Sequence, residues 1–399
     1  LFRCAYFTGF PCISPSKLIP LAPSQAMLEA DLLLSSYDYA LPKACIASRP
    51  ARPKESAKLL VYERKSGRIR HAKFGDLSEL LPECAIVFND TKVIKARIYG
   101  RKLNGTECEL FFHKALSEFE FLAQIKGRVK VGEILNFSHN INAEILALNA
   151  DGTRKVCFFK AEIKGENALN LSQNLLNLNE NSVNFDENSA QNSKREFLNL
   201  SEVFALLEKI GHIPLPPYIR RADTKQDSKD YQSIFAKNAG AVAAPTASLH
   251  FSRKMLANLK KTHEIHTLTL HIGAGTFKGV ECEDIRAHQM HAESFFAGQD
   301  LLNLIKSDKA ILGIGTTCTR CIEFMARTGL LSGQCDLFLH PKNPPLRQNY
   351  LLTNFHLPKS TLIMLVASFI GREKTLEIYS EAIKKGYKFY SYGDAMLVI

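Results

Sequence analysis

The chain has 399 residues, of which 46% are hydrophobic and 23% are charged, and its formal net charge is +11. Its longest strongly apolar run, TLIMLVASFI at 361–370, is far shorter than the about 20 residues that a membrane-spanning helix needs. The composition therefore argues against a membrane protein. A single hydrophobic core stops growing at roughly 250–300 residues, so more than one domain is expected.

The positive charge is clustered along the chain. Such clusters can bind the phosphates of a polyanion such as RNA, whereas a solvated basic face is the alternative explanation for the same charge. The clusters lie at 49–58, 64–73, 92–102 and 126–130.

The ten cysteines are scattered, and Cys318 and Cys321 are the one close pair in the body of the chain. A zinc site would need a second pair at matching spacing, so no metal site is expected. Scattered single cysteines suit a reducing compartment, and we expect the protein to be cytoplasmic. The first methionine is Met27, and residues 1–27 are expected to be a non-native or disordered extension.

The first predicted elements are a hairpin and a buried strand. LLVYER (59–64) and IRHAKF (69–74) flank the turn KSGR, and AIVFND (85–90) follows. Six short strands between 95 and 163 then favour a small β-barrel or sandwich. The Asn-rich stretch 165–200 is typical of a flexible segment.

From Ser201 onward helices and strands alternate, which indicates an α/β domain. SEVFALLEKIGH is predicted to be a helix capped by Ser201, and SRKMLANLKKT a helix capped by Ser252. HTLTLHIG and AILGIGTT are predicted strands. We therefore expect an α/β main domain formed by 28–88 and 206–399, with a small β-barrel domain inserted at 89–205 that contains the flexible segment 165–200.

The stretch LHIGAGTFKG (270–279) nearly spells a dinucleotide-binding loop. Its third glycine comes one position late and no helix pattern follows, so a pyrophosphate site is disfavoured. The glycines Gly273 and Gly275 would instead allow a bend where backbone approaches a ligand or a neighbouring segment.

Three further segments are rich in polar side chains beside apolar runs. GAVAAPTASLHFS (240–252) would either admit a ligand to its backbone or form a close-packed strand edge. AHQMHAE (287–293) places His288 and His291 three residues apart, on one face if the segment is helical. That pair would serve as a general base, as metal ligands with Glu293, or as a surface pair. GIGTTCTR (313–320) would bind a carboxylate or phosphate, or would be an ordinary capped helix.

Seven stretches together resemble one family closely, the S-adenosylmethionine:tRNA ribosyltransferase-isomerases of queuosine biosynthesis. They lie in the family's order from about Tyr37 to the C-terminus. They are VFNDTKVIKAR, IPLPPYIRR, YQSIFAKNAGAVAAPTASLHF, LHIGAGTFKGV, HQMHAE, LLTNFHLPKSTLIMLV and YKFYSYGDAML.

The resemblance implies that the ribosyl part of S-adenosylmethionine is transferred to 7-aminomethyl-7-deazaguanine at the tRNA wobble position and isomerised. The products would be epoxyqueuosine-tRNA, adenine and methionine. It also implies an inserted β-barrel, no cofactor beyond S-adenosylmethionine as co-substrate, and tRNA as partner. We expect no membrane association and a monomer.

The reaction needs proton transfer, which histidines and carboxylates perform. The candidate catalytic residues, without assigned roles, are His250, His271, His288, His291, Glu293 and His356. The candidate substrate-binding residues are Asn89, Asp90, Arg97, Pro245, Thr246, Gly273, Gly275, Thr276, Thr316, Thr317, Arg320, Asn354, Lys359, Tyr392 and Asp394. Arg320 with Thr316 and Thr317 is the predicted partner of the donor's carboxylate, and the basic residues of 92–102 and 220–221 are predicted tRNA contacts.

Two other functions remain open. A Rossmann-like methyltransferase acting on RNA would share donor and partner but would produce S-adenosylhomocysteine. A basic RNA-binding module would bind RNA without turnover of the donor.

Overall fold

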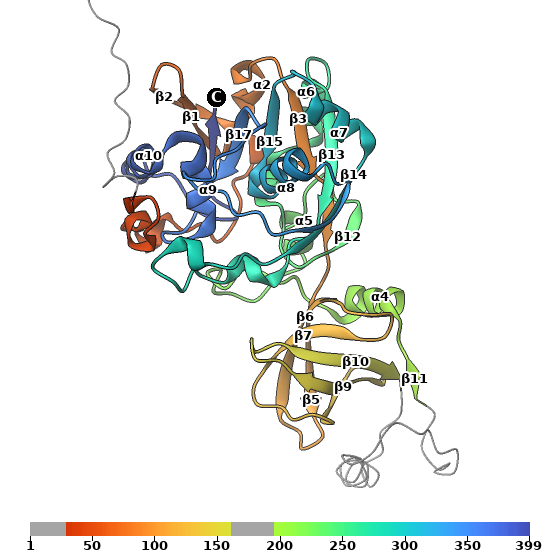
Figure 1. Cartoon of the computed structure of the whole chain (residues 1–399). Coiled ribbons are helices and arrows are strands. Elements are labelled where there is room, and N and C mark those ends of the chain that lie inside the picture. Colours follow the sequence, from red (N-terminus) through yellow and green to blue (C-terminus); the bar gives the residue numbers. More distant parts are fainter. Residues whose placement is uncertain (1–28, 161–194) are drawn as a thin grey trace, which may run out of the picture.

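The larger of two bodies in the computed structural model is built on a mixed sheet of nine strands (Figure 1). The model describes residues 29–160 and 195–399. The central strands β13, β3, β15 and β17 run parallel to one another. In sheet order the strands are β16 (Ser332–Cys335), β14 (Glu293–Ala297), β13 (Ile265–Leu270), β3 (Ala85–Asn89), β15 (Ile311–Ile314), β17 (Tyr350–Asn354), β18 (Ala395–Val398), β1 (Lys58–Glu63) and β2 (Arg68–Lys73).

Both faces of this sheet are covered, which explains why its strands are apolar at successive positions. In β3, Val87 packs with the residues of α7 and α8, whereas Phe88 packs on the opposite face with α2 and α6. The helices of the larger body are α2 (Leu77–Leu80), α5 (Asp227–Asp230), α6 (Arg253–Leu259), α7 (Gln299–Lys306), α8 (Gly315–Thr328), α9 (Thr361–Ile370) and α10 (Arg372–Lys384).

The smaller body is an antiparallel barrel. Its pairings run β10-β7-β6-β5-β8-β9, and β9 also pairs with β10, which closes the ring. Closure removes the exposed edges that an open sheet would present. Its elements are β5 (Arg97–Lys102), β6 (Glu107–Ala115), β7 (Phe121–Lys126), β8 (Ile134–Phe137), β9 (Ile141–Leu148), β10 (Arg154–Lys160), the short β11 (Glu196–Phe197) and helix α4 (Leu200–Ile210).

The predicted fold class is therefore confirmed: an α/β body with a small β-barrel inserted in it. The domain boundaries remain a prediction, and two details bear on them. Helix α4 crosses the predicted boundary at 205/206, and its residue Leu207 packs in the barrel core. Strand β4 (Thr91–Val93) pairs with β12 (Asn238–Ala241), at the junction of the two bodies.

Two predictions from local sequence are confirmed and one predicted helix cap is wrong. The hairpin of β1 and β2 and the Ser252 cap of α6 are confirmed. The N-cap of α4 is Asn199 and not Ser201, because the Asn199 side chain accepts from Glu202 N while Glu202 bonds back to it. The predicted extension 1–27 and most of the predicted flexible segment lie outside the described residues, and 195–200 forms β11 and the start of α4.

Every helix of the described residues is too short or too polar to cross a bilayer.

The barrel core supplies a stability prediction with an internal control. Phe112 is buried and its ring contacts Phe121 and Phe204, whereas Phe119 is 41% exposed in the next loop. Phe112→Ala should lower the free energy of unfolding by about 3 to 5 kcal/mol, because it removes a ring and leaves a cavity. Phe119→Ala should change it by less than about 0.5 kcal/mol. Urea unfolding followed by circular dichroism measures both, and equal losses would contradict the assignment of the core.

Candidate active site

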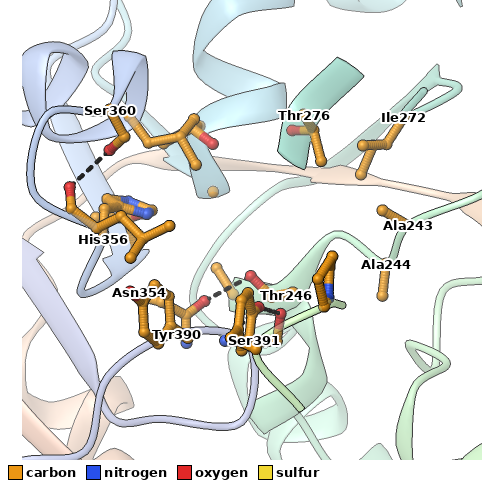
Figure 2. Close-up of a pocket in the computed structure, with 18 of the residues that line it drawn as sticks. Ala243, Ala244, Thr246, Ile272, Thr276, Asn354, His356, Ser360, Tyr390 and Ser391 are labelled. Atoms are coloured by element: carbon orange, nitrogen blue, oxygen red, sulfur yellow. Dashed lines mark hydrogen bonds between the residues drawn. The ribbon is translucent and has the colours of Figure 1, made fainter. Parts of the chain in front are cut away.

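A cavity of about 760 Å³ opens at the carboxyl ends of β15 and β17 (Figure 2). Ligands of open α/β sheets bind at this edge, because the loops that leave the strands surround it. Residues from loops far apart in the chain line the cavity: Lys43, Ile46, Ser48, 217–218, Arg220, Tyr231, 243–247, Ile272, Thr276, Lys278, Gly279, 315–317, 353–354, 356–362, Tyr390 and Ser391.

Two helices begin at the cavity wall. Helix α8 starts at Gly315 directly after β15, and Gly315 has a positive φ of 86°, a conformation that favours glycine. Helix α9 starts after Ser360, whose hydroxyl caps Ile363 N. The free N–H groups of a helix start carry partial positive charge and bind anions.

The wall is cationic. Four of the described lining residues are Lys or Arg and none is Asp or Glu. Ala243, Ala244 and Ala247 contribute only small side chains to the wall. The cavity therefore suits a ligand with a carboxylate or phosphate group.

A buried chain of hydrogen bonds lies behind one wall. Thr246 Oγ1 donates to Asn354 Oδ1 at 2.9 Å, and Asn354 Nδ2 lies 3.2 Å from His250 Nε2. Burial lowers the pKa of His250 to about 4, so its Nε2 is a neutral acceptor for the amide. The ring of Phe74 stacks on this imidazole.

His356 lies in the wall itself, in the loop between β17 and α9. Its Nε2 is 2.9 Å from Thr353 Oγ1, and its backbone N donates to Tyr379 Oη at 3.2 Å. Burial lowers the pKa of this imidazole to about 3. It is therefore neutral at pH 7.

Two stacked tyrosines form a flat part of the wall. The rings of Tyr218 and Tyr390 are 4.3 Å apart and 18° from parallel, and the Tyr218 hydroxyl hydrogen-bonds with Ser391 Oγ. Tyr390 has φ 71° and the lining residue Lys359 has φ 54°, values that cost a non-glycine residue about 1 to 3 kcal/mol. Such strain is found where a site needs a defined shape.

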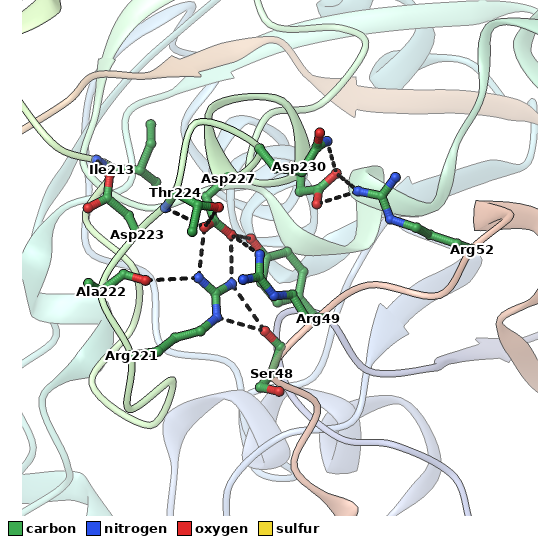
Figure 3. A network of polar contacts seen from close by, with 12 residues as sticks. Ser48, Arg49, Arg52, Ile213, Arg221, Ala222, Asp223, Thr224, Asp227 and Asp230 are labelled. Atoms are coloured by element: carbon green, nitrogen blue, oxygen red, sulfur yellow. Dashed lines mark hydrogen bonds and ion pairs between the residues drawn. The ribbon is translucent and has the colours of Figure 1, made fainter.

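A polar network fixes the Tyr218 segment against the segment that contains Ser48 (Figure 3). Arg221 bonds both oxygens of Asp227 at 2.7 Å and also reaches Ser48 O. Burial alone would raise the pKa of Asp227, but hydrogen bonds from Arg221 and Thr224 hold it well below its usual range. A second pair, Arg52 with Asp230 at 2.8 Å, fixes the same two segments.

A buried ion pair connects α8, β14 and the glycine loop after β13. Arg320 Nη1 lies 2.6 Å from Glu293 Oε2, and Glu293 Oε1 accepts from Gly273 N at 3.0 Å. Arg320 also donates to the carbonyls of Cys335 and Leu337 at 3.0 Å. This clamp positions the loop whose Thr276, Lys278 and Gly279 reach the cavity.

Comparison of the sequence with known proteins shows the family of this chain. A family model described as "Queuosine biosynthesis protein" matches residues 34–398. The chain belongs to this family. An S-adenosylmethionine:tRNA ribosyltransferase-isomerase of Campylobacter jejuni subsp. jejuni (strain 81-176) is 57% identical over 375 residues, which cover 93% of this chain and 100% of the relative. The protein of that name from Aliarcobacter butzleri is 51% identical over 92% of this chain and 99% of its own length.

Among solved structures, the S-adenosylmethionine tRNA ribosyltransferase from Thermotoga maritima is 26% identical to this chain. It covers 91% of this chain and 100% of its own, with a TM-score of 0.46.

The structure brings eight of the predicted site residues together around the cavity. They come from four segments of the chain, 245–246, 276, 316–317 and 354–359. They are Pro245, Thr246, Thr276, Thr316, Thr317, Asn354, His356 and Lys359.

The other predicted residues do not line this cavity, and most have partners in the protein. His271 bonds Thr91 Oγ1, Asn89 bonds the backbone of Leu270, and Asp90 accepts from Asn238. Their roles toward a substrate stay predictions. The same holds for His250, His288, His291, Glu293, Arg97, Gly273, Gly275, Arg320, Tyr392 and Asp394.

Two of these residues were expected to share a helical face, and this is wrong. His288 follows a single turn of 3-10 helix that ends at Ala287, and His291 lies in an extended segment before β14. The imidazole of His291 packs against Gly275. A Cβ on residue 275 would lie 2.4 Å from that ring, so only glycine leaves room for it. The glycine therefore lies where a neighbouring ring closely approaches the backbone.

The lining residues that sequence reasoning missed include Lys43, Ser48, Tyr218, Lys278 and Tyr390. Tyr218 and Tyr390 lie in the matched stretches IPLPPYIRR and YKFYSYGDAML, where an aromatic residue in a turn-rich loop was the available signal.

The clamp can be tested by removing one partner or both. Arg320→Met should lower the free energy of unfolding by about 3 to 5 kcal/mol, because Glu293 is left buried and unpaired. The double variant Arg320→Met/Glu293→Leu should recover much of that loss, yet Gly273 N still lacks its acceptor. The affinity of the double variant for S-adenosylmethionine, measured by calorimetry, should remain below that of the parent protein. Full recovery of affinity would rule out a positioning role for the clamp.

Acid should weaken the fold through His250. The imidazole binds its proton near pH 6.5 when unfolded but only near pH 4 when folded. Between these values the unfolded state holds more protons, so the free energy of unfolding falls as the pH drops, by up to about 3 kcal/mol. His250→Gln keeps a polar group beside Asn354 and should flatten this part of the pH profile. An unchanged slope in urea titrations between pH 7 and 4 would refute the assignment.

Proposed function

We propose that this protein transfers and isomerises the ribosyl group of S-adenosylmethionine onto 7-aminomethyl-7-deazaguanine at the wobble position of tRNA. The products are epoxyqueuosine-tRNA, adenine and methionine. One observation carries the proposal. The chain is 57% identical to a relative whose name states this activity, and the match covers the whole length of that relative. S-adenosylmethionine is a co-substrate, and we propose no further cofactor and a monomeric protein.

The cavity offers a place for the donor's methionyl carboxylate. The starts of α8 and α9 both line it, and Thr316, Thr317 and Ser360 add hydroxyls. No Asp or Glu lies among the described lining residues, and the lining residue Lys359 is paired with Asp38 at 2.6 Å, so Lys43, Arg220 and Lys278 supply the remaining positive charge of the wall. We therefore assign this end of the donor to the two helix starts, whereas the sequence had given this role to Arg320 with Thr316 and Thr317.

The stacked pair of Tyr218 and Tyr390 provides a flat apolar surface for a nucleobase. Both rings belong to loops that the Arg221 network and the Ser391 hydrogen bond fix in place. A preformed stacking surface avoids the entropic cost of ordering side chains when the substrate binds.

His356 is the proposed proton acceptor. The sulfonium of the donor acidifies the C5′ protons, so one must be removed before the ribosyl carbon can react. His356 is the imidazole among the described lining residues, and burial keeps it neutral. It is therefore in the unprotonated form that a base needs, while so low a pKa makes the imidazole a weak base in the protein without substrate. Thr353 Oγ1 fixes the orientation of the ring.

His356→Gln should lower kcat by about 10²- to 10⁴-fold, the usual contribution of a positioned base. The dissociation constant for S-adenosylmethionine should change only a few-fold, since the amide keeps the size and polarity of the wall. His263→Gln, which alters a histidine outside the cavity lining, is the control. Rapid-quench measurement of adenine release reports kcat, and a wild-type value for His356→Gln would exclude it as the base.

One assay separates the proposed function from its alternatives. The protein is incubated with S-adenosylmethionine and tRNA that carries the aminomethyl base, and both small molecules and nucleosides are identified by mass spectrometry. Adenine, methionine and epoxyqueuosine are expected. S-adenosylhomocysteine would identify a methyltransferase, and an intact donor with bound tRNA would identify an RNA-binding module.

A further inference from the structure

A second cleft, of about 350 Å³, lies between the barrel and the segment that follows α4. Pro217 and Arg220 line both this cleft and the first cavity, so the two are neighbours. Its lining residues from the barrel are Arg97, Tyr99, Glu109 and Lys126, and those from the connecting segment span 213–223 apart from Pro214 and Tyr218.

Tyr99 presents an aromatic ring to solvent in this cleft. The residue lies on the outward face of β5, next to the buried Ile98, and 52% of it is exposed. Its ring meets that of His212 edge-on, with centroids 5.1 Å apart and planes at 71°. A T-shaped contact covers at most one face of the tyrosine ring, so at least one face is left for stacking.

The position of this ring relative to the larger body is fixed by backbone contacts. His212 N donates to Arg97 O at 2.8 Å and Arg97 N donates to His212 O at 3.3 Å. Asp223 then bonds His212 Nδ1 at 2.9 Å and Ile213 N at 3.0 Å. The tyrosine therefore keeps a defined place beside the segment that leads into the first cavity.

The charges of the cleft leave two cations available. Arg97 lies 3.3 Å from Glu109, and Arg221 is bonded to Asp227. Both carboxylates of the cleft, Glu109 and Asp223, thus have a basic partner. Arg220 and Lys126 are both exposed, and neither has an ion-pair partner among the described residues. An exposed aromatic ring flanked by free cations is the arrangement that binds single-stranded nucleic acid.

We propose that this cleft binds a nucleotide of single-stranded RNA next to the reacting base. Tyr99 stacks on the neighbouring base, while Arg220 and Lys126 bind the adjoining phosphates. The inference rests on the proposed function, in which an anticodon-loop base enters the first cavity. It adds that a second nucleotide is held outside that cavity, so the protein recognises the loop at two places.

The test uses an anticodon stem-loop RNA with 2-aminopurine beside the wobble position, because stacking quenches its fluorescence. Tyr99→Ala should weaken binding by roughly 5- to 100-fold and relieve the quenching. Tyr99→Phe, which keeps the ring face, should retain both. Phe197→Ala removes an exposed ring elsewhere on the barrel and is the control. Unchanged quenching in Tyr99→Ala, or an equal loss in Phe197→Ala, would overturn the proposal.

Kinetics separate this inference from the proposed function. Tyr99→Ala should raise the KM for tRNA while kcat and the KM for S-adenosylmethionine stay unchanged. Lys126→Ala should reduce the slope of the logarithm of the RNA-binding constant against the logarithm of salt concentration, by up to about one released ion. If the parent protein releases adenine but the KM for tRNA is unaltered in Tyr99→Ala, the second site alone is refuted. If the parent releases no adenine yet Tyr99→Ala loses RNA affinity, the proposed function alone fails.

Discussion

The parallel pairing of β3, β15 and β17 is the constraint on which the site depends. Leu312 lies opposite Tyr350 in this register, so β15 and β17 end at the same edge of the sheet. Helix α8 leaves one strand directly and α9 follows the other after a short loop, which places both helix starts at one cavity. Antiparallel strands would have sent these ends to opposite edges. The meeting of two helix starts at one cavity is thus a consequence of sheet topology.

Electrostatics give this cavity its chemical character. Its cations lie in the wall, its described lining residues include no carboxylate, and the nearby histidines are kept neutral by burial. Two ion pairs, Arg320 with Glu293 and Arg221 with Asp227, lie behind the wall and fix the loops, whereas Lys359 of the wall is paired with Asp38.

Arg320 and Glu293 show what residue types alone leave open. Both belong to stretches that resemble a family of enzymes, and a guanidinium after a strand is a reasonable carboxylate ligand. In the structure the two are each other's partners, because α8 and β14 approach each other in the fold. Tyr218 and Tyr390 are the converse case: 172 positions separate them and no pattern links them, yet their rings stack.

By itself the sequence determined the fold class, the Ser252 cap, the hairpin of β1 and β2, and the family, because these depend on local spacing or on long uninterrupted matches. It also identified Thr246, Asn354 and His356, which line the cavity. Only the tertiary structure decided which histidine faces the cavity, which charges pair with each other, and that Tyr99 lies beside the segment after α4. Those outcomes depend on contacts between residues far apart in the chain, and neither periodicity nor composition records such contacts.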